Sequence, residues 1–511
     1  MSEWEGALTG SALLRDVRLV PLTQAAPEGP VDVRVRRGRV VQVGPGLAPE
    51  GEESHDGGGR WLMPGLWDQH VHLGQAALTR TRIDVSAAQS APEAAAIVAR
   101  ALPAGEHAES WRVVQGFGQR PALWPQQPTA AALDAVVGDT PVVLVSGDAH
   151  HGWLSTAAFH VLGIPPREGI LEEEEWWPVF ARLSSLPGAE QLLDAGYRAT
   201  FADCAALGVV GITDLEMGEG WAEWPGRVAD GLDTMRLRPG VYRQDLAGVL
   251  EAGVRTGDPL GDSGLVTMGP LKVISDGSLN TRTAFCCEPF ADSGDLAEPF
   301  GVQNVTPDEL RWLLDQATDA GLEAAIHAIG DHALADALDA FEQTGARGSV
   351  EHAQLVRLGD VPRMAALGVR ASVQPVHLWD DRDVIEHCWP DRAQRCFPLA
   401  TMRDAGVELA LGSDAPVAPL DPWLAIAAAV HRSADEREAW QPQEALTLRD
   451  ALAASTDGQG TVAPGSRADL LLVDVNPLDL HGDSRAQADA VRRLRPLLTM
   501  VAGRVVHTRS R

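Results

Sequence analysis

Short apolar segments alternate with Ala- and Leu-rich stretches over most of this chain, and this alternation constrains the fold more than any other feature. Strands that alternate with helices are typical of βα units and of a parallel sheet. We place eight strands, at residues 61–72, 209–214, 236–242, 271–277, 322–331, 349–353, 369–375 and 407–414. From the second strand onward the spacing averages about 30 residues, which predicts an α/β fold of the (β/α)8 TIM barrel type.

The gap after the first predicted strand is much longer than the others, so residues 76–200 must hold an insertion. Both ends of the chain have a different texture, with short strands between Gly and Pro, as in the alternating valines of residues 31–35. We therefore predict a composite β-sandwich domain built from residues 1–60 and 451–511. The barrel is expected to occupy residues 61–450 and to carry the insertion.

The chain is acidic, and this limits its partners. Its net charge of −29 argues against a surface that follows nucleic-acid phosphates or anionic lipids. The N-terminus has no signal-peptide pattern, no apolar run is long enough to span a membrane, and the five cysteines form no CxxC pair. We expect a soluble cytoplasmic protein that acts on a small molecule and binds neither nucleic acid nor membrane; a homodimer stays open.

His70 and His72 stand two residues apart at the end of an extended apolar segment. Because side chains alternate along a strand, both imidazoles fall on the same face and could chelate a metal ion. Two histidines in a strand are more often incidental, so this pair alone is a weak signal.

His327, His352 and Asp414 lie at the C-terminal ends of three other predicted strands. This is the face of a barrel on which active sites are found. A single histidine beside an apolar strand is usually a core or surface residue, but several ligand-type residues at coinciding strand ends are hard to explain in that way. Together they predict a metal site.

Lys272 is the only lysine in the chain, and every other Lys/Arg position holds arginine. A bias toward arginine explains exchange at surface sites but not at a site that needs a neutral amine, because arginine keeps its proton in proteins. A neutral amine can add carbon dioxide, and the carbamate is an anionic ligand able to bridge two cations. Chance survival of one lysine in a barrel strand is the alternative.

Several segments together resemble one known family. They are MPGLWDQHVHLG, LKVISDGSLNTRTA, HAIGD, VEHAQLV, VQPVH and LGSDAPVAPLDPW, together with DAHHGWLSTAAFHVLGI in the insertion. In sequence and in order they look like the amidohydrolase superfamily, in its YtcJ-like (amidohydrolase 3) branch. The resemblance covers nearly the whole chain and implies a (β/α)8 barrel with a composite β-sandwich.

The resemblance also implies a centre with two divalent metal ions, of which zinc is the expected kind. In the matching positions one ion is held by His70, His72 and Asp414, and the second by His327 and His352. Imidazole and carboxylate ligands independently suit Zn²⁺ or a similar ion.

In this resemblance Lys272 is carboxylated by carbon dioxide and bridges both ions. Lys272 and Asp414 are therefore the predicted catalytic residues, with Asp414 taking a proton from a metal-activated water and passing it to the leaving nitrogen. The expected reaction is hydrolysis of a C–N bond of the amide, N-formyl, N-acyl or carbamate type.

Five residues beside the metal positions are candidate substrate contacts: Asp148, His150 and Trp153 in the insertion, Arg282, and His377. Each has a plainer alternative. Asp148 and Arg282 could form a structural ion pair, the histidines could belong to loops, and Trp153 could be packing.

Two rival functions remain open at this point. One is a deaminase of the same superfamily, which typically holds a single metal and lacks a bridging lysine, so that Lys272 argues against it. The other is a protein that kept the fold and lost catalysis, and the complete set of ligand positions argues against that class.

Overall fold

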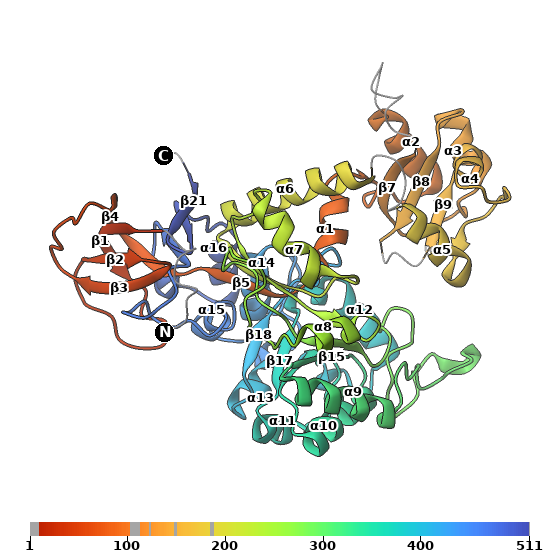
Figure 1. Cartoon of the computed structure of the whole chain (residues 1–511). Coiled ribbons are helices and arrows are strands. Elements are labelled where there is room, and N and C mark those ends of the chain that lie inside the picture. The colour runs from red at the N-terminus through yellow and green to blue at the C-terminus, as the bar shows by residue number, and fades with distance from the viewer. Residues whose placement is uncertain (1–9, 103–112, 122–123, 148–150, 184–188, 510–511) are drawn as a thin grey trace. The chain divides into compact units, whose positions relative to one another are not determined.

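The computed structural model describes residues 10–102, 113–121, 124–147, 151–183 and 189–509. The chain divides into two compact units. Unit 1 comprises residues 1–72 and 201–511, and unit 2 comprises residues 73–200. Figure 1 colours the chain from its N-terminus to its C-terminus and labels the elements of both units.

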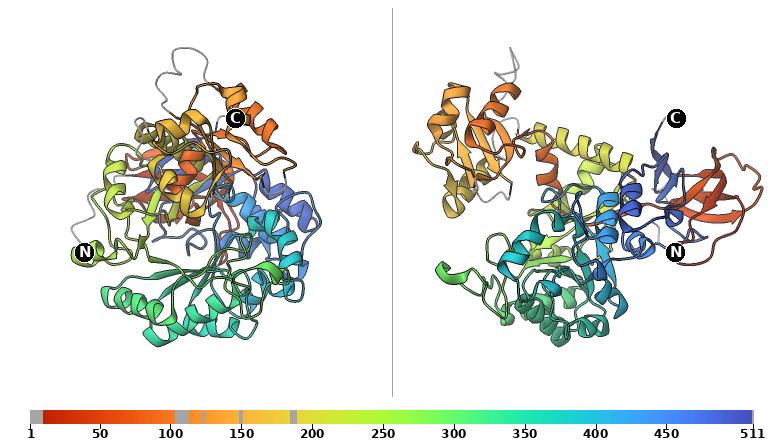
Figure 2. Two further views of the ribbon diagram at one scale, coloured as in Figure 1. Left: turned by 90° about the vertical axis from the view of Figure 1, so that its right-hand side faces the viewer. Right: turned by 180° about the vertical axis from the view of Figure 1, so that it is seen from behind.

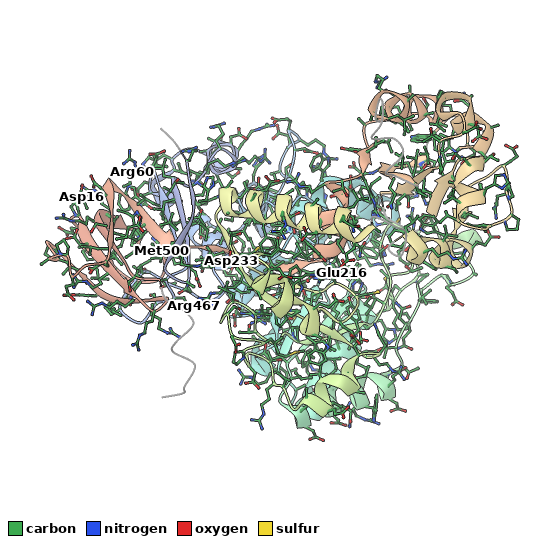
Figure 3. The ribbon with its side chains drawn as sticks, turned by 45° about the horizontal axis from the view of Figure 1, so that its top comes forward. Asp16, Arg60, Glu216, Asp233, Arg467 and Met500 are labelled. Atoms are coloured by element: carbon green, nitrogen blue, oxygen red, sulfur yellow. The ribbon has the colours of Figure 1, made fainter. Side chains whose placement is uncertain are left out.

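Strands from both ends of the chain pair in one seven-stranded sheet of unit 1, in the order β21-β20-β19-β4-β1-β2-β3. The strands are β1 (Ala12–Leu19), β2 (Val31–Arg36), β3 (Arg39–Gly44), β4 (Glu53–Pro64), β19 (Leu470–Val473), β20 (Leu498–Val501) and β21 (Arg504–Thr508). β4 runs parallel to β1 and antiparallel to β19, with Leu62 opposite Leu472. Met500, labelled in Figure 3, is fully buried in the core of this sheet.

The strands of βα units form two further sheets of unit 1, in the orders β12-β11-β5 and β13-β14-β15-β16-β17-β18, with all neighbours parallel. Their bounds are β5 (Leu66–Val71), β11 (Val209–Asp214), β12 (Arg236–Pro239), β13 (Val241–Tyr242), β14 (Leu271–Ile274), β15 (Ala324–Ala328), β16 (Gly348–His352), β17 (Arg370–Val373) and β18 (Leu409–Leu411). Each of the eight segments expected to be a strand therefore contains one.

The two parallel sheets adjoin at both of their edges. Only Gly240 separates β12 from β13, and its N–H continues the pairing of β12 with β11 by donating to the carbonyl of Asp214 at 2.8 Å. After β18, the Asp414 N–H donates to the His70 carbonyl at 2.7 Å, and the His72 N–H donates to the Ala415 carbonyl at 2.9 Å. These bonds bring the C-terminal ends of β5 and β18 together.

Helices alternate with these strands. They are α7 (Gly220–Ala229), α8 (Leu246–Ala252), α9 (Pro307–Ala320), α10 (Asp331–Thr344), α11 (Val361–Leu367), α12 (Leu378–Cys388), α13 (Leu399–Asp404), α14 (Pro422–His431), α15 (Leu448–Ala453) and α16 (Ser484–Arg492). Side chains cap the starts of α9, α14, α15 and α16; Thr306, for example, accepts a hydrogen bond from the Glu309 N–H ahead of α9. In Figures 1 and 2, α9, α10 and α11 lie along the outer side of β15 and its neighbours.

Unit 2 has a five-stranded sheet of its own, in the order β10-β9-β8-β7-β6. Its strands are β6 (Ile83–Asp84), β7 (Val114–Gln119), β8 (Val142–Ser146), β9 (His151–Leu154) and β10 (Leu171–Glu172). Its helices are α1 (Leu73–Thr79), α2 (Ala91–Ala101), α3 (Ala130–Val137), α4 (Thr156–Val161), α5 (Glu173–Leu183) and most of α6 (Ala189–Leu207). Two buried clusters form the core of this unit.

All five cysteines are free thiols. Among the helices of the described residues, none is both long enough and apolar enough to cross a membrane.

Candidate metal centre

Parallel strands bring the ligand-type residues of unit 1 to one edge. His70 and His327 are the second-last residues of β5 and β15, and His352 is the last residue of β16. Asp414 follows β18 by three residues, and Lys272 lies one strand away from His327, on β14. Since the carboxyl ends of neighbouring parallel strands meet at the same edge, the six residues selected from the sequence can converge.

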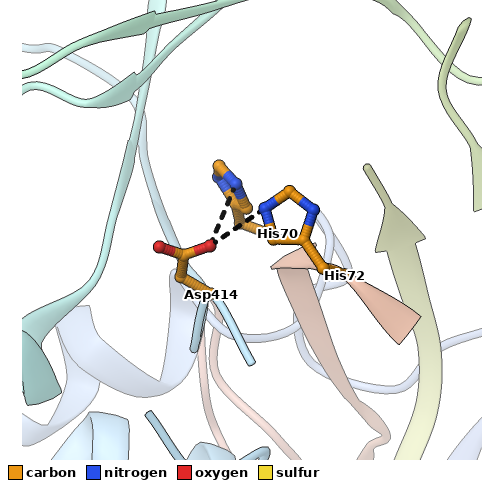
Figure 4. A group of neighbouring side chains, drawn as sticks. All are labelled: His70, His72 and Asp414. Carbon is orange, nitrogen blue, oxygen red and sulfur yellow. Dashed lines mark ion pairs between the residues drawn. The ribbon is translucent and has the colours of Figure 1, made fainter. Parts of the chain in front are cut away.

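His70, His72 and Asp414 form the first close group, which Figure 4 shows. The Asp414 Oδ1 lies 3.4 Å from His70 Nε2 and 3.2 Å from His72 Nε2. The candidate ligand atoms of this group all lie within 4.8 Å of one another. His72 Nδ1 is buried and has no hydrogen-bond partner among the described residues.

A second close group consists of His352, His377 and Asp414, so Asp414 belongs to both. His377 Nε2 lies 3.7 Å from Asp414 Oδ2. The His352 ring lies 4.4 Å from the His327 ring and 5.0 Å from the His70 ring, between centroids. His352 therefore connects the two groups, and His327 joins them through it.

Lys272 is buried in the strand, with 2% of its surface exposed, and its Nζ has no hydrogen-bond partner in the described part of the chain. Burial lowers the pKa of this amine, while the negative charges of Glu351 and Asp414 oppose the shift. A lysine in this setting loses its proton more readily than one in water. The amine is thus chemically suited to carboxylation.

Burial also keeps two of the imidazoles neutral. It lowers the pKa of His327 to about 3, with the charge on Lys272 as the next cause. The pKa of His352 is likewise far below its usual value, first because of burial and then because of His327. Neutral imidazole is the form that binds a metal ion.

The pKa values of Asp414 and His72 are shifted in the direction that favours their charged forms. Burial alone would raise the pKa of Asp414. The charge of His70 and the hydrogen bond with His72 outweigh burial and hold this pKa well below its usual range, so Asp414 is a carboxylate. Burial likewise works against protonated His72, but Asp414 and the charge of Glu216 raise its pKa. Glu216, labelled in Figure 3, follows the end of β11.

Three buried carboxylates around the site were missed in the sequence. Glu351 Oε2 lies 2.7 Å from His70 Nδ1. Asp276 accepts backbone hydrogen bonds from Phe285, Ile329 and Gly330, and burial raises its pKa to about 7. The third, Asp68, accepts the N–H groups of His70 and Ser413. Their positions in the sequence could have identified them, because each carboxylate stands within four residues of a predicted ligand in the chain.

The predicted substrate contacts have different outcomes. Asp148 and His150 lie outside the described residues. His377 lies at the centre, as described above. Arg282 Nε forms an ion pair with Asp292 Oδ2 at 3.0 Å, and a role of Arg282 in substrate binding stays a prediction.

Trp153 does not lie where a substrate contact was expected. Its side chain is fully buried in the core of unit 2, and its Nε1 donates to the Thr129 carbonyl at 2.8 Å. A ring with no exposed surface cannot contact a substrate, so the expected role was wrong and the packing alternative holds. The indole follows the rule that a buried tryptophan finds an acceptor for its N–H.

The donor set fits a divalent metal ion. Five imidazoles and one carboxylate gather at this edge of the strands. Four buried nitrogens among them and Lys272 have no hydrogen-bond partner among the described residues: His72 Nδ1, His352 Nδ1, His377 Nε2 and Lys272 Nζ. Buried polar atoms without partners are costly, and a ligated metal ion removes that cost. Imidazole with carboxylate is the ligand chemistry of Zn²⁺ and related ions.

Comparisons with known proteins agree with this chemistry. A family model described as "Amidohydrolase family" matches residues 54–507. The putative amidohydrolase YtcJ of Bacillus subtilis (strain 168) is 27% identical over 85% of this chain and 88% of its own length. An N-substituted formamide deformylase of Arthrobacter pascens is 26% identical over 92% of this chain and 94% of its own.

Solved structures point the same way. The crystal structure of an uncharacterized metal-dependent hydrolase from Pyrococcus horikoshii OT3 is similar to this chain, with a TM-score of 0.78 and 25% identity. The match covers 92% of this chain and 98% of that one.

Proposed function

We propose that this chain, which belongs to the amidohydrolase family, is a metal-dependent hydrolase that cleaves a C–N bond of a small molecule. One observation carries the proposal: at the carboxyl edge of the parallel strands, buried neutral imidazoles, an ionised Asp414 and the only lysine of the chain converge. A core built for packing alone has no use for this combination.

The proposed centre holds two divalent ions, and zinc is the metal that its donors suit best. His70, His72 and Asp414 would hold one ion, and His327 and His352 the other. Carboxylated Lys272 would serve both, which its burial and lack of a partner support. His377 is either a further ligand, beside Asp414, or a substrate contact.

When bound, the ions supply Lewis-acid chemistry, which polarises a carbonyl and makes water more acidic. Asp414 acts on the proton, because its carboxylate is ionised and lies among the imidazoles. Its carboxylate takes one proton from the attacking water, whose oxygen bonds to the carbonyl carbon. The C–N bond breaks, and the same proton goes to the leaving nitrogen, so that one water yields a carboxylic acid and an amine.

We propose a substrate of the amide, N-formyl, N-acyl or carbamate class. The deformylase from Arthrobacter pascens acts on an N-substituted formamide according to its name, and it matches 92% of this chain. Arg282, and Asp148 and His150 in unit 2, are proposed to help bind the rest of the substrate.

For the fold, we propose that the two parallel sheets close into one (β/α)8 barrel over residues 61–450. Closure is supported at one edge by the hydrogen bonds between the ends of β5 and β18, and at the other by Gly240, the single residue between β12 and β13. We further propose that the seven-stranded sheet, built from both ends of the chain, belongs to a composite β-sandwich domain.

A mononuclear deaminase is the second candidate, and a single observation separates it from the first. A one-metal centre leaves Lys272 without a task, although its amine is buried, unpartnered among the described residues and beside Asp414. A non-catalytic relative would have no reason to keep such an amine either.

The experiment is a hydrolysis screen on the zinc-loaded full chain with N-formyl, N-acyl, carbamate and cyclic amide compounds, with release of the amine as the readout. We expect turnover in one of these classes and its loss in Asp414→Asn. Release of ammonia from amino-substituted heterocycles, with every amide left intact, would favour the deaminase instead.

A further inference from the structure

Glu351 and His352 are neighbours on β16, and yet both side chains reach the same imidazole. In a regular strand, successive side chains point to opposite faces. Here the backbone turns left-handed at the end of the strand, with φ of 70° at His352 and 40° at Ala353. As a result Glu351 bonds to His70, while the His352 ring lies 5.0 Å from the His70 ring.

The Glu351 carboxylate is held on both of its oxygens. Oε2 lies 2.7 Å from His70 Nδ1, and Oε1 accepts the Ser349 hydroxyl at 2.5 Å. The side chains of His70 and Glu351 are 1% and 2% exposed, so water does not compete for this bond. A carboxylate can only accept here, and therefore the proton of the His70 ring sits on Nδ1.

We propose that Glu351 is a positioning residue of the metal centre, which fixes the tautomer and the ring orientation of His70. With the proton on Nδ1, the free electron pair is on Nε2, the nitrogen that lies 3.4 Å from Asp414 Oδ1. This inference rests on the proposed function, because it gives His70 Nε2 as the atom that binds the ion. Bonds of this kind between a carboxylate and a ligating histidine orient the ring and raise its basicity.

A hydrogen-bond acceptor also fixes the tautomer of His327, but there the proton is on Nε2 instead of Nδ1. Its Nε2 lies 3.1 Å from the carbonyl of Gly277, which can only accept, so that the proton sits on Nε2 and Nδ1 is free. The neighbouring acceptors, and not the imidazoles themselves, thus decide which nitrogen each ring offers to an ion.

The test measures metal binding directly. Metal-depleted full-length chains are titrated with Zn²⁺ against a chromophoric chelator, and the absorption of Co²⁺-loaded protein reports the ligand geometry. We expect Glu351→Ala to weaken Zn²⁺ binding by about 10- to 100-fold and to shift the Co²⁺ spectrum. Glu351→Gln keeps the shape and a carbonyl acceptor, so we expect a smaller loss and a fold that survives.

Glu444→Gln is the matched control. Glu444 is also buried and also accepts two hydrogen bonds, from the N–H and the hydroxyl of Thr401, but among the described residues it makes no hydrogen bond or ion pair with the ligands of the centre. This variant should lose stability and keep the Zn²⁺ affinity of the wild type.

The possible results distinguish the positioning role of Glu351 from the proposed function. Wild-type affinity and an unchanged Co²⁺ spectrum in both Glu351 variants would overturn the positioning role and leave the proposed function standing. Failure of the wild-type chain itself to bind Zn²⁺ or Co²⁺ would overturn both.

Discussion

At the scale of single residues, the backbone of the site is strained at two of the proposed metal ligands. His352 and Asp414 have φ of 70° and 58°, in the left-handed region that residues with a side chain rarely adopt. Each such residue costs on the order of 1–3 kcal/mol, and surrounding structure has to hold it in place. At Asp414 the backbone bond to the His70 carbonyl provides such a hold.

Some residues of the site could be predicted from the sequence, and others could not. His70, His72 and Asp414 were predictable because strand ends and residue type carried the signal. Glu351 was not, because strand periodicity turns it away from His352, and only the left-handed backbone reverses that expectation. Trp153 was misassigned because a sequence does not distinguish an aromatic ring in a core from one that lines a site.

Lys272→Arg tests the need for a neutral amine. Arginine keeps the positive charge in the buried site and cannot be carboxylated, so we expect kcat/KM to fall by at least about 100-fold. The variant should also bind less Zn²⁺ in elemental analysis while its far-ultraviolet circular dichroism is retained. Arg198→Lys, in an exposed i,i+4 ion pair with Asp194, is the control and should behave as wild type. Full activity of Lys272→Arg would refute the role of the lysine.

His327 makes the metal-depleted protein sensitive to acid. Its pKa is lowered from 6.5 to about 3 by burial, so between these values the unfolded chain binds a proton that the folded chain does not. The contribution of His327 is therefore full above pH 6.5 and is lost as the pH falls, by about 1.4 kcal/mol per pH unit.

His327→Gln removes this titration. Urea unfolding of the metal-depleted variant between pH 6.5 and pH 4.5 should show a free energy of unfolding that falls less steeply than in wild type, by about 1 kcal/mol per pH unit. Curves of equal slope would show that this imidazole does not titrate as stated.

At the scale of elements, the strands were the most predictable part. All eight expected strands are present, because apolar runs with Gly and Pro at their ends are strong local signals. The pairing of β4 with β19, more than 400 residues apart, depends on contacts that no local pattern reports. In unit 2, β6 and β10 have two residues each, which is too short for a strand pattern to be visible in the sequence.

Gly412 controls how closely β18 approaches β5. A Cβ at this position would lie 2.9 Å from both the Cβ and the N of His70, and 3.2 Å from Asp68 Oδ1. Gly412→Ala must therefore push the two strands apart and move Asp414 away from His70. We expect a loss of about 1–3 kcal/mol in the free energy of unfolding and weaker Zn²⁺ binding.

Gly226→Ala is the matched control on α7, where a Cβ meets nothing within 4 Å. It should leave Zn²⁺ binding unchanged and stabilise the helix by about 0.5–1 kcal/mol. Equal effects of the two substitutions in urea unfolding and Zn²⁺ titration would contradict the special position of Gly412.

At the scale of the whole molecule, every candidate ligand belongs to unit 1, and unit 2 has its own sheet and core. A bound ion stabilises only the part of the fold that holds it, by about 2.7 kcal/mol when its free concentration is 100 times Kd. Removal of metal should therefore increase amide hydrogen exchange in β5 and in β14 to β18, and leave β7 and β8 unchanged. A uniform increase across both units would argue against a centre confined to unit 1.

The proposed metal centre for C–N bond hydrolysis can be tested by elemental analysis of the purified, metal-replete full-length chain. We expect about two divalent ions per chain, and loss of both the ions and amide hydrolysis in the double variant His70→Ala/His72→Ala. Folded wild-type protein without stoichiometric metal would contradict it.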